Sequence, residues 1–219
     1  MSTKLVSEQS KPSQWWRERS IELSLTLLSL LFALFFFSQF AMWVEERSGV
    51  VLDDPVLNLL TPVDLTWPIF ALIYGGLLLA VTRLLPSPDA LLLTIRSYTL
   101  LLLVRIVVMY LAPFAQPDGM ILLRDPVAGL GPGGAMTNDL FFSGHTATMF
   151  LFFLTARERR FKSIFLFLTV LLGVMLLMQH VHYTVDVVAA PFFTFGCYVL
   201  AQKITWKGSV EEKPQLPLR

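Results

Sequence analysis

The three histidines of this chain fall at two places along the sequence. His145 stands alone, whereas His180 and His182 lie together, and Asp186 follows His182 by four residues. On a helix, residues four apart share a face, so the Asp186 carboxylate can accept a hydrogen bond from one nitrogen of His182. The other nitrogen then keeps its lone pair, which suits a nucleophile or a general base. The alternative is an intrahelical bond that only neutralises a buried aspartate.

The segment around His145 has features of an anion site at a helix N-terminus. Asn138 or Asp139 can cap a helix whose first turns present Ser143 and Gly144. Backbone N–H groups, a hydroxyl and a residue without Cβ together favour close approach of a phosphate. A Ser-Gly pair is equally typical of close contacts between membrane helices, so this segment alone leaves both interpretations open.

Composition indicates the elements that position these residues. Of 219 residues, 55% are hydrophobic and 15% charged, against about a quarter charged in soluble domains. Several segments approach the roughly 20 apolar residues that cross a bilayer. We therefore predict an all-α, polytopic membrane bundle of six transmembrane helices. The predicted spans are Ile21–Val44, Leu65–Arg83, Ser97–Phe114, Leu140–Ala156, Ser163–Gln179 and Tyr183–Gln202.

The positive charges predict the orientation of the bundle. With the N-terminus inside, the outer loops hold only Arg47 and Arg124, and Arg105 lies within the third span. The remaining lysines and arginines fall on the inner side, which predicts cytoplasmic termini and histidines near the outer face. The expected organisation is a cytoplasmic segment (1–20), a transmembrane domain (21–206) and a cytoplasmic tail (207–219). The Gly- and Pro-rich segment Ala115–Asp139 should form an outer loop.

Taken together, the motifs resemble a known family. Ser143-Gly144-His145-Thr146 and His182-Tyr183-Thr184-Val185-Asp186-Val187 are similar to the two catalytic motifs of the sphingomyelin synthase family. That family is a branch of the type 2 phosphatidic acid phosphatase superfamily. Its first motif has an aspartate six residues before the histidine, where Asp139 stands, and Arg96 with the segment 105–113 resembles an earlier arginine-containing motif. The resemblance covers about residues 95–202.

Two departures distinguish the chain from the phosphatase branch of the superfamily. The Lys-x6-Arg-Pro pattern of that branch is missing, because no lysine lies between Lys11 and Lys162. Leu176 stands where that branch has an arginine, six residues before its nucleophilic histidine. Both departures favour the synthase-like branch.

The resemblance implies transfer of a phospho-headgroup from a membrane phospholipid to a lipid alcohol such as ceramide or diacylglycerol. His182 would attack phosphorus, Asp186 would orient it, and His145 would act as acid and then base, with no metal or other cofactor. We expect Arg105, Ser143 and Gly144 to bind the phosphate, with Asp139, Tyr183 and Thr184 in support. Arg105 lies about 12 Å below Pro113 on a helix, within reach of the site, or it forms an ion pair between helices.

Three alternatives stay open. A phosphatase would use water as the acceptor and release inorganic phosphate. A non-enzymatic metal- or haem-binding protein would use His145, His180 and His182, and a transporter would use histidine and aspartate as a proton relay. The chain has no basic stripe with interleaved aromatic residues, so we expect no nucleic-acid partner. We expect the enzyme in a bacterial inner membrane. The sequence does not indicate an oligomeric state.

Overall fold

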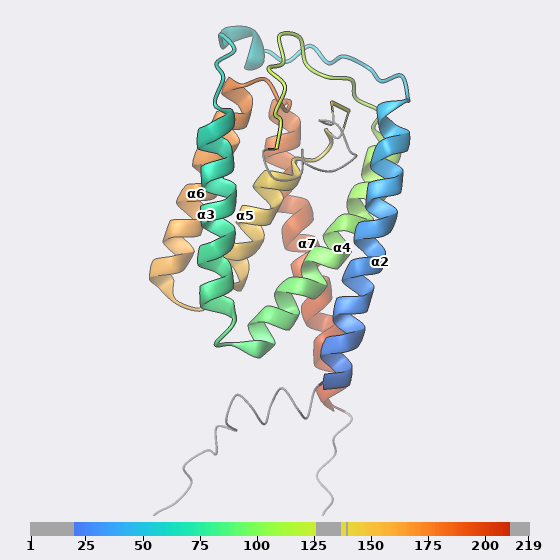
Figure 1. Cartoon of the computed structure of the whole chain (residues 1–219), viewed down its shortest axis with the longest axis vertical. Helices are drawn as coiled ribbons and strands as arrows, with labels where there is room; N and C mark the ends of the chain where they lie inside the picture. Colours follow the sequence, from blue (N-terminus) through green and yellow to red (C-terminus); the bar gives the residue numbers. More distant parts are fainter. Residues whose placement is uncertain (1–19, 126–136, 139, 211–219) are drawn as a thin grey trace, which may run out of the picture.

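The computed structural model of the chain describes residues 20–125, 137–138 and 140–210. This part of the chain is all-helical. It contains the α-helices α2 (Ser20–Glu45), α3 (Thr66–Leu84), α4 (Pro88–Leu111), α5 (Gly144–Thr155), α6 (Arg159–Met178) and α7 (Thr184–Val210), with a short 3-10 helix, η1 (Leu57–Leu59). The six α-helices form one bundle, as the sequence predicts (Figure 1).

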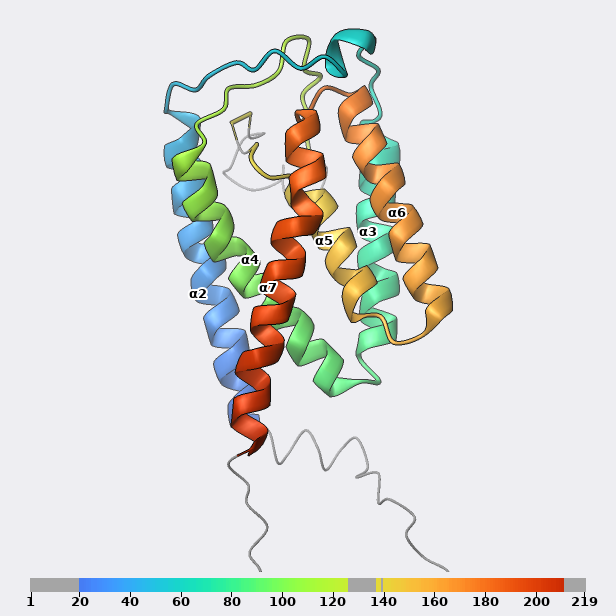
Figure 2. The same cartoon turned by 180° about the vertical axis from the view of Figure 1, so that it is seen from behind.

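The helices alternate in direction through the bundle. Figures 1 and 2 show that α2 begins and α7 ends at the same end of the molecule, while the connections α2–α3, α4–α5 and α6–α7 gather at the other end. Helix α4 packs against α2 and α7, and α5 packs against α6 and α7. Helices α4, α5 and α7 therefore surround the centre of the bundle.

Among the residues that the structure describes, five helices are long and apolar enough to cross a membrane: α2, α3, α4, α6 and α7. Large apolar side chains on their outer faces are exposed, among them Leu31 and Phe35 on α2 and Phe192 on α7. Exposed side chains of this kind on several faces are typical of a surface covered by lipid. The chain is therefore a multi-pass membrane protein.

Helix α5 is the exception in length. It has 12 residues, or about 18 Å at 1.5 Å per residue, whereas the hydrocarbon core is about 30 Å thick. The predicted span Leu140–Ala156 was wrong at its start, because residues 140–143 are not helical. In Figure 1, α5 begins well below the connecting segments at that end of the bundle.

The predicted third span was also wrong at its start. Helix α4 begins at Pro88 rather than Ser97 and ends at Leu111 rather than Phe114. The charged Arg96 does not interrupt α4, because its charge is paired: Nη2 of Arg96 lies 2.6 Å from Oε1 of Glu22 on α2. This ion pair lets the helix carry an arginine between two packed helices. At the other end of the chain, α7 continues to Val210, past the predicted boundary at residue 206.

Candidate active site

Ser143 caps the first turn of α5. Its side-chain oxygen accepts hydrogen bonds from Thr146 N at 3.4 Å and from Thr146 Oγ1 at 3.1 Å. Serine is a preferred N-cap because its oxygen satisfies a backbone N–H that has no partner within the helix. Gly144 and the half-exposed His145 are the next two residues, in the first turn of α5. The cap thus sets the direction in which this turn presents its N–H groups and His145.

Arg105 of α4 lies directly against Gly144. A Cβ atom added to Gly144 would stand 2.5 Å from Arg105 Nη1 and 2.9 Å from Arg105 Cζ. The missing side chain at position 144 therefore leaves room for the guanidinium beside the helix N-terminus. Arg105 is only 7% exposed, and its Cζ lies 4.9 Å from the centre of the Phe37 ring on α2. The charge of the Arg105 guanidinium therefore lies next to the partial positive charge of the α5 N-terminus.

The pair His182–Asp186 is buried just before and within the first turn of α7. Nδ1 of His182 lies 3.4 Å from Oδ2 of Asp186, and that oxygen also accepts a 2.9 Å bond from Tyr183 N. Asp186 thus receives the N–H of the residue that precedes α7, as the acidic residue of a capping box does. With Nδ1 facing the carboxylate, Nε2 is the nitrogen of His182 left for chemistry. The residues pair as the sequence predicts.

One backbone bond joins the two histidine motifs. Ser143 N donates to the carbonyl oxygen of Asp186 at 3.1 Å, so the residue that caps α5 is tied to the first turn of α7. Both turns lie on the side of the bundle where the long connections gather (Figure 2). The structure therefore brings together Arg105, the motif from Ser143 to His145, and the pair His182–Asp186.

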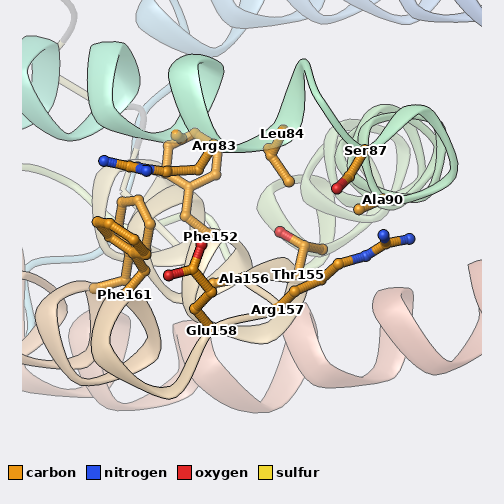
Figure 3. Close-up of a pocket in the computed structure, with 12 residues that line it drawn as sticks. Arg83, Leu84, Ser87, Ala90, Phe152, Thr155, Ala156, Arg157, Glu158 and Phe161 are labelled. Atoms are coloured by element: carbon orange, nitrogen blue, oxygen red, sulfur yellow. The ribbon is translucent and has the colours of Figure 1, made fainter. Parts of the chain in front are cut away.

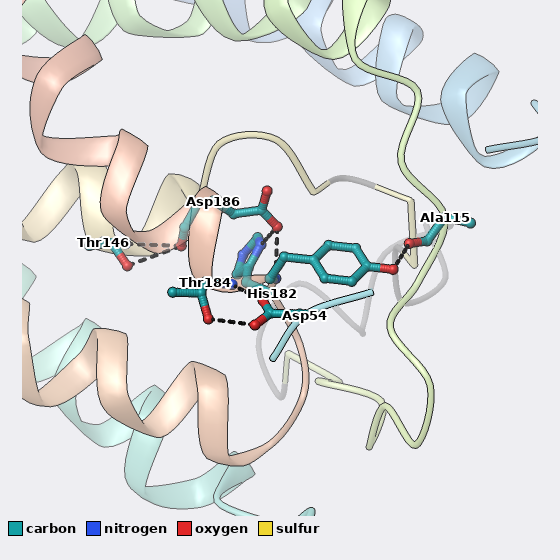
Figure 4. A network of polar contacts seen from close by, with 8 residues as sticks. Asp54, Ala115, Thr146, His182, Thr184 and Asp186 are labelled. Atoms are coloured by element: carbon teal, nitrogen blue, oxygen red, sulfur yellow. Dashed lines mark hydrogen bonds and ion pairs between the residues drawn. The ribbon is translucent and has the colours of Figure 1, made fainter. Parts of the chain in front are cut away.

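Asp54 is a residue of this site that the sequence analysis did not identify. It lies in the connection between α2 and α3, and its carboxylate accepts bonds from Thr184 N at 2.6 Å and Thr184 Oγ1 at 3.0 Å. Figure 4 shows it beside His182 and Asp186 at the start of α7. The carboxylate also accepts bonds from Val56 N and Leu57 N. Asp54 therefore caps α7 from a segment 130 residues earlier in the chain.

These hydrogen bonds favour the ionised form of the Asp54 carboxyl group. Burial acts to raise the pKa of the Asp54 carboxyl, but the hydrogen bonds from Thr184, Leu57 and Val56 outweigh burial and hold that pKa below its usual value of 3.8. A carboxylate at a helix N-terminus is also stabilised by the helix dipole. Asp54 is therefore an anion at neutral pH. Thr184, expected to support the phosphate site, is bonded to this carboxylate.

Tyr183 connects the site to two of the segments that join the helices at this end of the bundle. Its hydroxyl donates to Ala115 O at 3.0 Å and accepts a bond from Leu52 N at 3.1 Å. Ala115 N in turn donates to Val50 O. The ring is 1% exposed. The buried Tyr183 therefore holds the segments that carry Leu52 and Ala115 together beside the start of α7.

Glu45, the last residue of α2, anchors the segment that precedes Ser143. Its carboxylate accepts bonds from Thr137 N at 2.7 Å, Thr137 Oγ1 at 2.8 Å and Asn138 N at 2.8 Å. This contact was also missed by the sequence analysis. Asn138 does not cap α5, since Ser143 does, and Asp139 lies outside the described residues.

His180 does not join the other two histidines. Its Nδ1 lies 2.9 Å from the carbonyl oxygen of Asp118, and it adopts a positive φ of 57° at the corner between α6 and α7. The neighbouring Gln179 accepts a bond from Leu65 N and donates to Ile121 O, so this corner holds the α2–α3 and α4–α5 connections. Within the described ranges no group of three His, Cys, Asp or Glu residues could hold a metal ion.

The comparisons with known proteins bear on the same region. A family model described as "PAP2 superfamily C-terminal" matches residues 136–203, which include α5, α6 and the part of α7 that carries Asp186. No curated protein matches the chain. The matched region contains His145, His182 and Asp186. The chain is therefore a multi-pass membrane protein in which residues 136–203, about a third of its length, are similar to the C-terminal part of the PAP2 superfamily, a similarity consistent with a lipid phosphatase or phosphotransferase.

Proposed function

We propose that the chain transfers a phospho-headgroup from a glycerophospholipid to a lipid alcohol, such as ceramide or diacylglycerol, through a phosphohistidine on His182. The observation that carries this proposal is the bond from Ser143 N to Asp186 O. It places the N-terminus of α5, with His145 in its first turn, beside the pair His182–Asp186. A nucleophile with its orienting carboxylate, an acid–base group and a phosphate cradle thus meet at one place.

The first half-reaction forms the bond from His182 Nε2 to phosphorus. The phosphorus–oxygen bond to the donor's diacylglycerol breaks, and His145 gives its proton to the departing oxygen. Asp186 holds Nδ1–H of His182 and stabilises the positive charge that develops on the ring. The 3.4 Å separation in the resting site is expected to shorten as that charge appears.

The second half-reaction reverses the direction of proton transfer. His145, now neutral, takes the proton from the hydroxyl of the acceptor lipid, whose oxygen attacks phosphorus and displaces His182 Nε2. Histidine titrates near neutral pH and can serve in both steps. No step needs a metal ion.

The phosphate charge is countered by two features. The guanidinium of Arg105 beside Gly144 suits paired contacts with phosphate oxygens. The first N–H groups of α5 point to the same place and stabilise an anion. The Ser143 oxygen accepts two bonds from Thr146, which leaves its hydroxyl hydrogen to donate to a phosphate oxygen.

The short length of α5 supports a lipid alcohol as the acceptor. With its last residue near one face of the bilayer, the N-terminus of a helix of about 18 Å lies roughly 12 Å below the other face. A lipid hydroxyl can reach this depth from the leaflet, and proximity then favours it over water. Hydrolysis is the second candidate, because the matched superfamily is consistent with a lipid phosphatase as well as a phosphotransferase.

We further propose that the site opens to the extracytoplasmic side of a bacterial inner membrane and that both termini are cytoplasmic. Supporting this orientation, Arg83, Arg157, Arg159 and Arg160 lie at the end of the bundle opposite to the histidines.

Product analysis tests the reaction. Purified full-length protein would be incubated with a phospholipid labelled in its headgroup phosphate, with ceramide, a diacylglycerol whose acyl chains differ from those of the donor, or no acceptor. We expect the label on the acceptor lipid, and an acid-labile label on the protein that His182→Ala abolishes. Inorganic phosphate as the main product from phosphatidic acid under every acceptor would establish the phosphatase instead. Activity in His182→Ala above about a tenth of the original would refute a covalent role for His182.

A further inference from the structure

A cavity of about 200 Å³ lies at the other end of the bundle, where the α3–α4 turn meets the α5–α6 connection. Its interior is apolar and aromatic, with Leu84, Phe152 and Phe165 all buried. Thr155, the last residue of α5, also lines it, so nearly the whole of α5 separates this cavity from Gly144. The cavity is therefore distinct from the histidine site.

Charged side chains surround its mouth. Arg83 at the end of α3, and Arg157 and Glu158 in the α5–α6 connection, line the cavity and are exposed. Figure 3 shows Arg83 and Arg157 on opposite sides of the mouth, with Glu158 between them. Cζ of Arg83 lies 4.0 Å from the centre of the Phe161 ring. One face of the guanidinium packs on the Phe161 ring, so the N–H groups of Arg83, which lie in the guanidinium plane, stay available to other acceptors.

The mouth has a surplus of positive charge. In the part of the chain that the structure describes, neither Arg83 nor Arg157 forms an ion pair, although Glu158 lies beside them. Arg159 and Arg160 follow directly in the sequence and are exposed. The two guanidinium groups outnumber the one carboxylate at the mouth, and this net positive charge beside an apolar cavity complements a molecule with an anionic head and an apolar body.

We infer that this cavity binds the headgroup of an anionic glycerophospholipid from the leaflet at that end of the bundle. The phosphate contacts Arg83 and Arg157, and the glycerol region with the first methylene groups covers the aromatic interior. A cavity of this size holds a headgroup and leaves the acyl chains along the bundle surface. A free phosphate ion satisfies the arginines but leaves the aromatic interior uncovered, so the lipid is the better complement.

Lipid binding to the purified full-length protein tests the inference without any measurement of turnover. Native mass spectrometry would compare the retention of phosphatidylglycerol, phosphatidylcholine and inorganic phosphate by the original chain and by two double variants. Arg83→Gln with Arg157→Gln removes the two arginines at the mouth. Arg160→Gln with Lys162→Gln removes the same charge from the start of α6 without touching the cavity lining.

We expect the original chain and the Arg160→Gln/Lys162→Gln variant to retain phosphatidylglycerol in preference to phosphatidylcholine. The Arg83→Gln/Arg157→Gln variant should bind phosphatidylglycerol about 10-fold or more weakly, given the contribution of each basic residue near an anionic lipid. An equal loss of phosphatidylglycerol binding in both variants would mean that general surface charge causes the effect, and it would overturn the inference. So would binding of inorganic phosphate as tight as that of the lipid, or unchanged binding in both variants. A variant with a changed melting temperature would be replaced by the single substitution Arg157→Gln.

Discussion

Substituting Gly144 with alanine should lower the reaction rate of the proposed site without lowering the stability of the fold. The added Cβ would stand 2.5 Å from Arg105 Nη1, and ordinary contact begins near 3.4 Å. The guanidinium must therefore move by about 0.9 Å away from the α5 N-terminus. Because the clashing atoms are at the end of a long side chain, this movement costs little free energy of folding. Alanine also favours the helix by up to about 1 kcal/mol over glycine.

The rate should respond more strongly than the stability. A displacement near 1 Å of a group that positions a substrate can cost about 100-fold in rate, so we expect Gly144→Ala to lower kcat by roughly 10- to 100-fold while the melting temperature stays the same or rises. The matched control is Gly75→Ala in α3, where an added Cβ meets nothing within 4 Å. Headgroup transfer and thermal unfolding would be measured on all the purified proteins.

A double-mutant cycle shows whether the loss acts through Arg105. If alanine at position 144 displaces the guanidinium, Gly144→Ala combined with Arg105→Gln should be no slower than Arg105→Gln alone. Additive losses would mean that Gly144 acts through another contact. A kcat for Gly144→Ala within about threefold of the Gly75→Ala control would refute the proposed place of Arg105 in the phosphate cradle.

Three further predictions follow from the same geometry. Asp54→Ala should destabilise the protein by about 1–2 kcal/mol as a lost cap and lower kcat more than KM, and the exposed neighbour Asp53→Ala should change neither. Asp54→Asn should recover only part of both losses, because both carboxylate oxygens of Asp54 accept bonds whereas an amide has one acceptor oxygen. Because the folded pKa of Asp54 lies below 3.8, its contribution is present at neutral pH and is lost as the pH falls through the folded pKa, so Asp54→Asn should weaken the acid dependence of the melting temperature. In a Cys197→Ala background, Ser48→Cys should react with an impermeant thiol reagent added to intact cells and Arg160→Cys should not, and the reverse pattern would invert the proposed orientation. Transfer should persist in excess chelator, and loss of activity that a divalent ion restores would contradict the metal-free mechanism.

Local sequence signals predicted the parts of the site that depend on local geometry. The pairing of His182 with Asp186 follows from their four-residue spacing on a helix, and the structure places them 3.4 Å apart. The reach of Arg105 toward the first motif followed from the helical rise, and the guanidinium lies against Gly144. The catalytic roles of these residues stay predictions.

The errors in helix boundaries have a common cause. Counting apolar residues predicted the fourth span from Leu140, but membrane sequence can be apolar without being helical where protein surrounds it. The better signal was Ser143, a preferred N-cap. For α4, Pro88 with Asp89 after it is a typical helix start. The charge on Arg96 hid this start, because its partner Glu22 lies on another helix.

Asp54 and Glu45 could not be found in this way, because their partners are distant in sequence. Asp54 meets Thr184 across 130 residues, and Glu45 meets Thr137 across 92. Asp54 did carry one local signal, since an aspartate that accepts a bond from the residue two positions on forms a typical turn, as it does with Val56 N. That signal predicts a turn but not its place above α7. Asp54 precedes residues 136–203 in the chain, so the α2–α3 connection supplies the proposed site with a residue that the matched C-terminal region does not contain. If Asp54→Ala affects kcat as predicted, the functional unit must extend from the α2–α3 connection to α7.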